Sequence, residues 1–136
     1  MVVKKILTIA LLAMSIFLAG CGSSHQAALT GVLGHPHYMT LPFGTVMTVQ
    51  IVEMTQDGSG RTIAEQVTRD QEIGIPRPFI VVYDQGKINQ DHAYVVSVRI
   101  EDSTGKLIYA SEKDVPVITH GNPIKDINLT VVLVNG

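Results

Sequence analysis

Hydrophobic and polar residues alternate with a period of two along most of the chain after residue 40. Four segments carry the pattern most clearly: TVMTVQIVE (45–53), PFIVVYD (78–84), AYVVSVRIE (93–101) and INLTVVLV (127–134). Alternation of this kind places apolar side chains on one face of a β-strand, and β-branched residues favour that conformation. Four weaker segments are predicted to be strands as well: ALTGVLG (28–34), TIAEQVTR (62–69), KLIYAS (106–111) and VPVIT (115–119).

Turn-forming residues separate these segments. Glycine, proline, serine and asparagine cluster in LPFG (41–44), DGSG (57–60), QG (85–86), STG (103–105) and HGNP (120–123). The clearest hairpin is RIEDSTGKLIY, in which Gly105 is well placed for the positive φ that closes a short loop. The short candidate helix IAEQVTRD is rich in β-branched residues and is predicted to be a strand instead. We therefore expect an all-β chain that forms an antiparallel β-sandwich of about seven to eight strands.

The N-terminus has the layout of a secretory signal. Lys4 and Lys5 precede an uncharged apolar run over residues 6–19, which is shorter than the ~20 residues of a membrane-spanning helix. The run ends in Leu-Ala-Gly-Cys (18–21), which looks like a bacterial lipobox and contains the only cysteine of the chain. We expect cleavage between Gly20 and Cys21 and attachment of a lipid to the Cys21 sulfur, because only a thiol can form the thioether. The alternative is an ordinary secretory signal followed by a free cysteine.

These features divide the chain into a lipoprotein signal peptide (1–20), a lipidated tether (21–27) and one β-domain (28–136). All 12 acidic residues but only 8 of the 10 basic residues follow position 20, which gives the mature chain a formal charge of −4. This charge argues against nucleic acid as a partner. Residue 22 is glycine rather than the aspartate that commonly retains lipoproteins in the inner membrane. The expected location is therefore the outer membrane of the cell envelope, with the domain facing the periplasm.

The order of motifs in the domain resembles the YbaY-like lipoproteins, a family that includes the YscW-type lipoprotein chaperones, or pilotins, of type III secretion. The pattern begins with a Pro-Gly turn before an apolar strand and continues with a Pro-x-Pro-Phe strand that ends in Tyr-Asp. A strand led by tyrosine, an Asp-x-x-Gly-x-Leu turn and a Pro-Val pair follow. The matching positions are Pro42, Gly44, Val49, Ile51, Pro76, Pro78, Phe79, Tyr83, Asp84, Ile88, Tyr94, Asp102, Gly105, Leu107, Pro116 and Val117.

The resemblance implies a small β-sandwich on an outer-membrane lipid anchor. Pilotins of this type bind a secretin subunit and help it reach and assemble in the outer membrane, whereas YbaY-like members are loosely linked to envelope polysaccharide or glycoprotein metabolism. The leading hypothesis is a non-catalytic lipoprotein that binds an envelope partner such as a secretin. A general role associated with envelope polysaccharide or peptidoglycan is the alternative, and a small envelope hydrolase is the third.

Candidate chemical groups are sparse. His35 and His37 are spaced as a metal pair would be on a strand, with His92, His120 or Asp91 as further ligands, but Pro36 favours an exposed loop and no metal is expected. The chain contains neither a Gly-x-Ser-x-Gly motif nor a cofactor motif, so the lipid on Cys21 is the only non-protein group expected. Glu53, Glu65 and Glu101 could be proposed as paired carboxylates, but each is expected to be an ordinary outward polar residue of a strand.

A partner-binding surface is the remaining hypothesis. The alternation predicts that Ile80, Val82, Val132 and Val134 lie on faces opposite the core. They are either covered by a neighbouring loop or sheet, or exposed as part of a groove for a partner segment. Free edge strands of a sandwich would also suit an unstructured partner tail.

Overall fold

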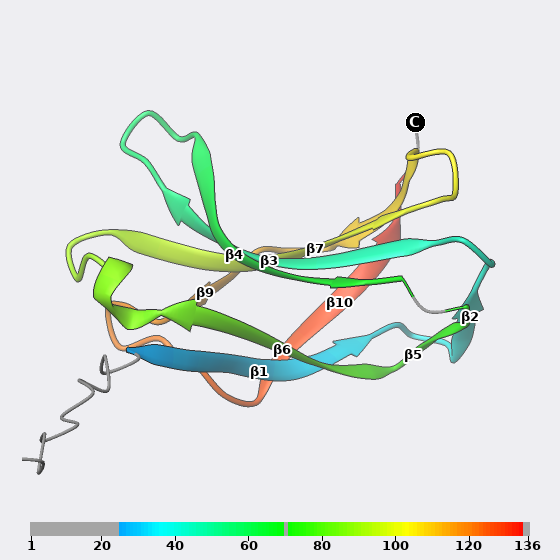
Figure 1. Cartoon of the computed structure of the whole chain (residues 1–136), viewed down its shortest axis with the longest axis horizontal. Coiled ribbons are helices and arrows are strands. Elements are labelled where there is room, and N and C mark those ends of the chain that lie inside the picture. Colours follow the sequence, from blue (N-terminus) through cyan, green and yellow to red (C-terminus); the bar gives the residue numbers. More distant parts are fainter. Residues whose placement is uncertain (1–24, 70, 135–136) are drawn as a thin grey trace, which may run out of the picture.

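The computed structural model describes residues 25–69 and 71–134, which form β-strands and one 3₁₀ helix, η2 (Gln85–Lys87) (Figure 1). No helix in this described part is long and apolar enough to cross a lipid bilayer. The strands are β1 (Gln26–Gly34), β2 (Met39–Leu41), β3 (Val46–Met54), β4 (Gly60–Thr68), β5 (Ile73–Ile75), β6 (Arg77–Asp84), β7 (Ala93–Glu101), β8 (Leu107–Ser111), β9 (Val115–Val117) and β10 (Ile127–Leu133).

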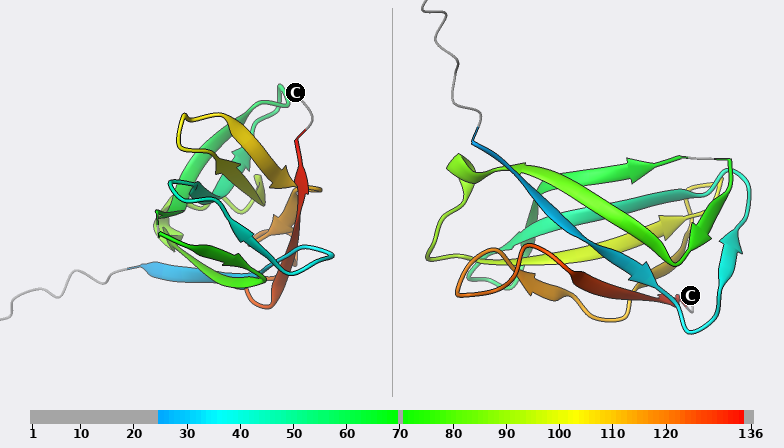
Figure 2. Two further views of the ribbon diagram at one scale, coloured as in Figure 1. Left: turned by 90° about the vertical axis from the view of Figure 1, so that its right-hand side faces the viewer. Right: turned by 90° about the horizontal axis from the view of Figure 1, so that it is seen from below.

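The main sheet curls around a single core. Its strand order is β4-β3-β7-β8-β10-β1-β6, with β9 paired to β7. β4, β3 and β7 form one layer, β1 and β6 form the other, and β10 crosses steeply between them (Figure 1). Seen along the long axis, the strands surround the core in a nearly closed ring (Figure 2). The short strands β2 and β5 pair with each other at the end away from the start of β1.

The predicted all-β fold is confirmed, and each of the eight predicted segments contains a strand, including β4 in place of the candidate helix. Sequence reasoning missed β2 and β5, because three-residue strands are too short to show alternation. The expectation of a wholly antiparallel sheet is wrong at one position, since β1 and β10 pair in parallel. Strand direction depends on where the connections run, which alternation within a strand does not encode.

The core follows the predicted alternation closely. Every second residue of β3 and β7 is buried, and the two strands pair along their full length from Val46↔Glu101 to Met54↔Ala93. The inward row of β6 lies opposite them across the core. The largest fully buried side chains are Tyr94, Leu29, Leu33, Met47, Ile51, Ile73, Ile75, Ile100, Leu129, Val49, Val81 and Val96.

Many motif residues of the family resemblance build turns. Gly44 and Gly105 both adopt positive φ (81° and 87°), as predicted for Gly105. The Asp102 carboxylate accepts hydrogen bonds from the Thr104 hydroxyl and from the backbone N–H groups of Lys106 and Thr104, and these bonds hold its pKa below the ordinary value. The resemblance therefore rests largely on residues that determine the fold.

Strand β1 approaches its neighbours unusually closely at Gly31. A Cβ atom at this position would lie 2.1 Å from the carbonyl oxygen of Ile127 on β10 and 2.6 Å from a ring carbon of Phe79 on β6. Both distances are far below van der Waals contact, so only glycine fits. At Gly34 on the same strand, the nearest atom to an added Cβ lies 3.8 Å away.

We expect Gly31→Ala to lower the free energy of unfolding by about 1–3 kcal/mol, the usual cost of overpacking a core. Gly34→Ala is the matched control and should change stability little, because its new methyl group meets only ordinary contacts. Chemical denaturation followed by circular dichroism measures both. Equal stability of the two variants would contradict the close approach.

Candidate partner-binding surface

The structure leaves the predicted surface residues accessible. Ile80 and Val82 on β6 are 48% and 51% exposed, Val132 on β10 is 37% exposed, and Val134 is partly exposed. The hypothesis that a loop or a second sheet covers them is therefore wrong for the described residues. Val32 on β1 and Val67 on β4 are exposed as well.

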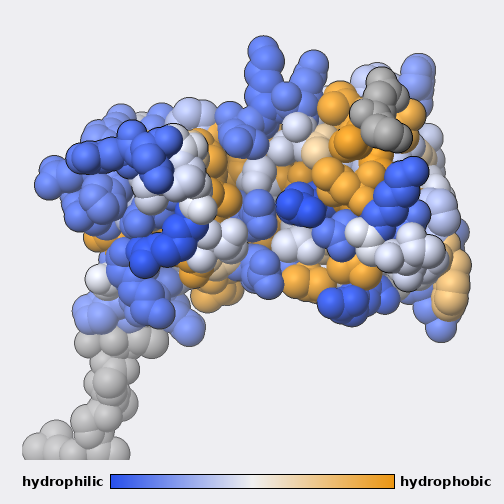
Figure 3. Space-filling model, turned by 90° about the horizontal axis from the view of Figure 1, so that it is seen from above, coloured by the Kyte–Doolittle hydropathy of each residue, from blue (hydrophilic) through white to orange (hydrophobic). Residues whose placement is uncertain are grey.

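These residues form two patches rather than one. Val82 and Ile80 pair with Ala28 and Thr30 of β1, whereas the parallel pairing of β10 with β1 places Val132 beyond the end of β1. The offset along the strands is about six residues, or roughly 20 Å. On the upper face, apolar surface is likewise broken into separate areas by polar side chains (Figure 3). We call Ile80 and Val82 the β6 patch, and Val132 and Val134 the C-terminal patch. A partner segment that binds the β6 patch therefore need not reach the C-terminal patch.

The β6 patch borders a seam where the curled sheet does not close. β4 and β6 are the two ends of the strand path and are not paired with each other in the described chain. A hydrogen bond bridges them, from the backbone N–H of Ile80 to the side-chain oxygen of Gln66 at 3.1 Å. A glutamine side chain here takes the place of a strand partner.

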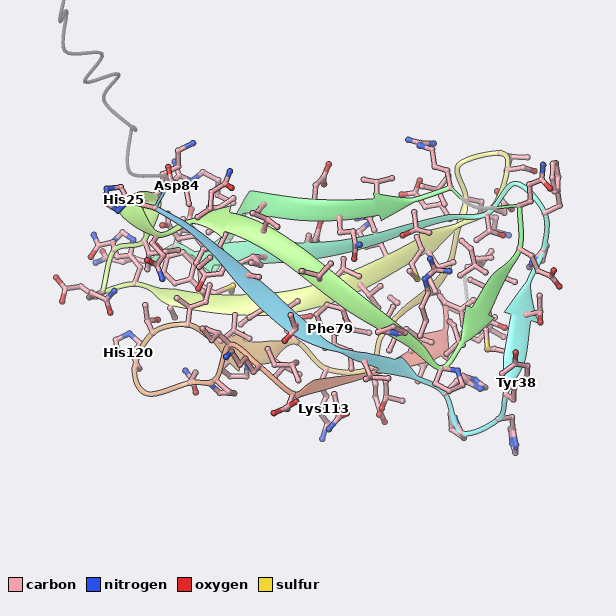
Figure 4. All side chains as sticks on the ribbon, turned by 60° about the horizontal axis from the view of Figure 1, so that its bottom comes forward. His25, Tyr38, Phe79, Asp84, Lys113 and His120 are labelled. Carbon is pink, nitrogen blue, oxygen red and sulfur yellow. The ribbon has the colours of Figure 1, made fainter. Side chains whose placement is uncertain are left out.

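The seam widens towards the end where β1 begins, because the β3–β4 hairpin bends away from the β6 layer (Figure 1). A hollow of about 420 Å³ lies between the strands here, lined by Ile63 and Ala64 of β4, Val82, Tyr83 and Asp84 of β6, and His25, Gln26 and Lys87. A second hollow of about 470 Å³ is lined by Arg61, Thr62, Ile63 and Lys87. His25 and Asp84 lie at this end of the molecule, and Tyr38 lies at the opposite end (Figure 4).

A buried carboxylate anchors the wide end of the seam. Glu53 is only 6% exposed and accepts a hydrogen bond of 2.6 Å from the Tyr94 hydroxyl, which itself accepts one from the backbone N–H of Asn89. Arg61 binds the other oxygen of Glu53 at 3.0 Å, and His92 lies 3.4 Å from the first. The cluster joins β3, β4, β7 and the loop after η2.

The Tyr94 hydroxyl is the main reason why the pKa of Glu53 lies below its ordinary value, with smaller contributions from His92 and Arg61 that oppose the effect of burial. Burial raises the pKa of Tyr94, and the hydrogen bond to Glu53 raises it further. The expectation that Glu53 points outward is wrong, because it continues the inward row of Met47, Val49 and Ile51. Glu65 is exposed as expected, and Glu101 is partly exposed and contacts Arg99 at 3.3 Å.

The histidine pair lies away from the wide end of the seam, next to Tyr38 at the opposite end of the molecule (Figure 4). His35 and His37 occupy the exposed loop between β1 and β2, as Pro36 indicates, and the His37 N–H donates to the His35 ring at 3.2 Å. Asp91 and His92 lie in the loop after η2, and His120 lies at the end opposite Tyr38 (Figure 4). Within residues 25–69 and 71–134, no three metal-ligating side chains gather. Cys21 and Gly20 lie outside the described residues.

Two comparisons with known proteins agree with this architecture. The family model described as "Type III secretion system lipoprotein chaperone (YscW)" matches residues 24–129. A solved structure of an alternative pilotin from the type II secretion system of Vibrio cholerae is 28% identical, with a TM-score of 0.71. The alignment covers 82% of this chain and 99% of that protein. The search of curated proteins found no significant match.

We expect Tyr94→Phe to weaken the acid sensitivity of the fold. The pKa of Glu53 lies below the ordinary 4.5 in the folded chain, so its ionised form stabilises the fold above that pH and the contribution is lost as the pH falls through the folded pKa. Removing the Tyr94 hydroxyl raises the folded pKa towards 4.5. Denaturation at pH values from about 6 to about 3 should therefore show a smaller loss of stability in the variant than in the wild type.

Tyr83→Phe is the control for this experiment. Tyr83 is also buried, its pKa is raised by burial, and it contacts no carboxylate within hydrogen-bond distance in the described chain. Removal of the Tyr83 hydroxyl should leave the pH dependence of the free energy of unfolding unchanged. An identical change in both variants would contradict the role assigned to Tyr94.

Proposed function

Because the chain belongs to the YscW family of type III secretion system lipoprotein chaperones, we propose that it is a pilotin that binds a secretin subunit at the outer membrane. The similarity to a pilotin of a type II system supports the same kind of partner. Chaperones of this family act by binding rather than by catalysis. The observation that carries the proposal is the exposed apolar pair Ile80 and Val82, which borders an open seam in an otherwise closed sheet.

The proposal includes a lipid anchor on Cys21. Four positions separate Cys21 from His25, where the described structure begins, and so short a chain spans at most about 14 Å. The wide end of the seam lies beside His25 and Gln26. A lipid on Cys21 would therefore hold this end of the domain close to the membrane, where a secretin has to insert.

We expect Ile80→Asp to reduce secretin capture about tenfold, because a carboxylate on the apolar patch would have to be desolvated on binding. The measurement is crosslinking of the lipidated protein in living cells, followed by mass spectrometry of the captured proteins. Val132→Asp, on the separate C-terminal patch, is the matched control and should leave capture unchanged. Recovery of only abundant envelope proteins with the wild type would overturn the pilotin proposal.

Cys21→Ser should release the protein from the outer-membrane fraction and abolish secretin capture there, since serine cannot form the thioether. Fractionation of cells with an antibody against the domain measures the release. A Gly22→Ser variant keeps the cysteine and should remain in the membrane. Retention of the Cys21→Ser protein in the outer membrane would argue against the lipid anchor.

A further inference from the structure

Within residues 25–69 and 71–134, strand β6 has one edge that pairs with no other strand. Its other edge pairs with β1 from Gln26↔Asp84 to Leu33↔Arg77. Two hydrogen bonds fix which backbone groups face the free edge. Ile80 N–H points to Gln66 on β4, and Thr30 N–H, opposite Ile80, points away from β6 to the carbonyl of Ile124 at 3.0 Å. Thr30 and Ile80 are therefore a pair that exchanges no hydrogen bonds between β1 and β6.

The same alternation shows which edge of β6 the backbone N–H and C=O of Val82 face. Residues two apart on a strand present their backbone groups to the same edge, so the N–H and C=O of Val82 also face the seam. The hollow of about 420 Å³ lies directly beside Val82. A row of backbone donors and acceptors thus runs along the free edge, blocked at Ile80 by the Gln66 side chain. The exposed side chains of Ile80 and Val82 flank the same row.

Positive charge marks the wide end of this edge. Lys87 lines both hollows, and Arg61 lines one of them. Asp84, the acidic residue that lines the hollow of about 420 Å³, already accepts a hydrogen bond from the N–H of Gly86. The Arg61 side chain remains 70% exposed although it binds Glu53. A segment that lies along the edge would therefore meet cations where it passes Asp84.

We infer that the free edge of β6 takes up an extended segment of the partner by strand addition, with Gln66 as a placeholder that the segment displaces. The segment runs antiparallel to β6, alternates apolar and polar residues, and carries acidic residues at its N-terminal end, where antiparallel pairing brings them to Lys87 and Arg61. This inference rests on the proposed function and adds the chemistry and conformation of the bound segment. A helical segment would leave the backbone groups of Val82 unpaired.

The test uses the mature protein and a fluorescein-labelled peptide, acetyl-EETVTVTV-amide, in fluorescence anisotropy titrations. We expect saturable binding that Val82→Pro weakens at least about tenfold, because proline removes the N–H that faces the seam. Val82→Ile keeps both that N–H and an apolar side chain, so it should bind far more tightly than Val82→Pro. Gln66→Leu should bind several-fold more tightly, since Ile80 N–H is then free, and Lys87→Glu should bind more weakly.

A second probe tests strand pairing on the wild-type protein, so the result does not depend on whether Val82→Pro folds. The same peptide with N-methyl groups on its valines and threonines cannot pair with a strand and should not bind the wild type. Absence of binding to both wild type and Gln66→Leu, or equal binding of the methylated peptide, would overturn strand addition. If the protein instead binds phosphatidylglycerol vesicles and not the peptide, Lys87 and Arg61 would be assigned to lipid headgroups, and this result would also overturn strand addition. Secretin capture that is unaffected by Val82→Pro would retain the pilotin proposal and remove only this inference.

Discussion

The uninterrupted pairing of β3 with β7 is the constraint on which the rest of the structure depends. Nine consecutive residue pairs fix the register from Val46↔Glu101 to Met54↔Ala93, so all inward side chains of both strands reach the same core. A slip of one residue would expose that whole row to solvent. The register also brings Glu53 opposite Tyr94, which allows the buried carboxylate to be satisfied by a hydroxyl group.

Much of this arrangement could be predicted from the sequence because alternation directly reports which side chains share a face. The outward positions of Ile80 and Val82 followed from the inward positions of Phe79 and Val81. The same rule, carried one step further along β3, would have placed Glu53 inside with Ile51. The outward expectation for Glu53 fails because a charged side chain is buried only where partners compensate for its desolvation, and Tyr94 and Arg61 do so here.

The seam could not be predicted in this way. It depends on which strands end the sheet and on how far the sheet curls, and both follow from long-range connections rather than from local pattern. Gln66 is a polar residue on an inward row, flanked by Ala64 and Thr68, which is a hint that this row does not meet a fully apolar environment. The sequence alone does not show that Gln66 lies beside Ile80, because only the folded topology brings β4 and β6 together. The seam therefore results from the strand topology, whereas the exposure of Ile80 and Val82 beside it follows from the alternation in the sequence.

The parallel pairing of β1 with β10 has a mechanical consequence. β1 is the first strand of the described residues, and it is hydrogen-bonded on one side to β6 and on the other to β10, the last strand described. A pull at residue 25 along the axis of β1 loads both ladders in shear, so that their hydrogen bonds resist together and do not open one after another. The first described strand is thereby held by the last one, and the domain can bear tension at residue 25 without peeling open.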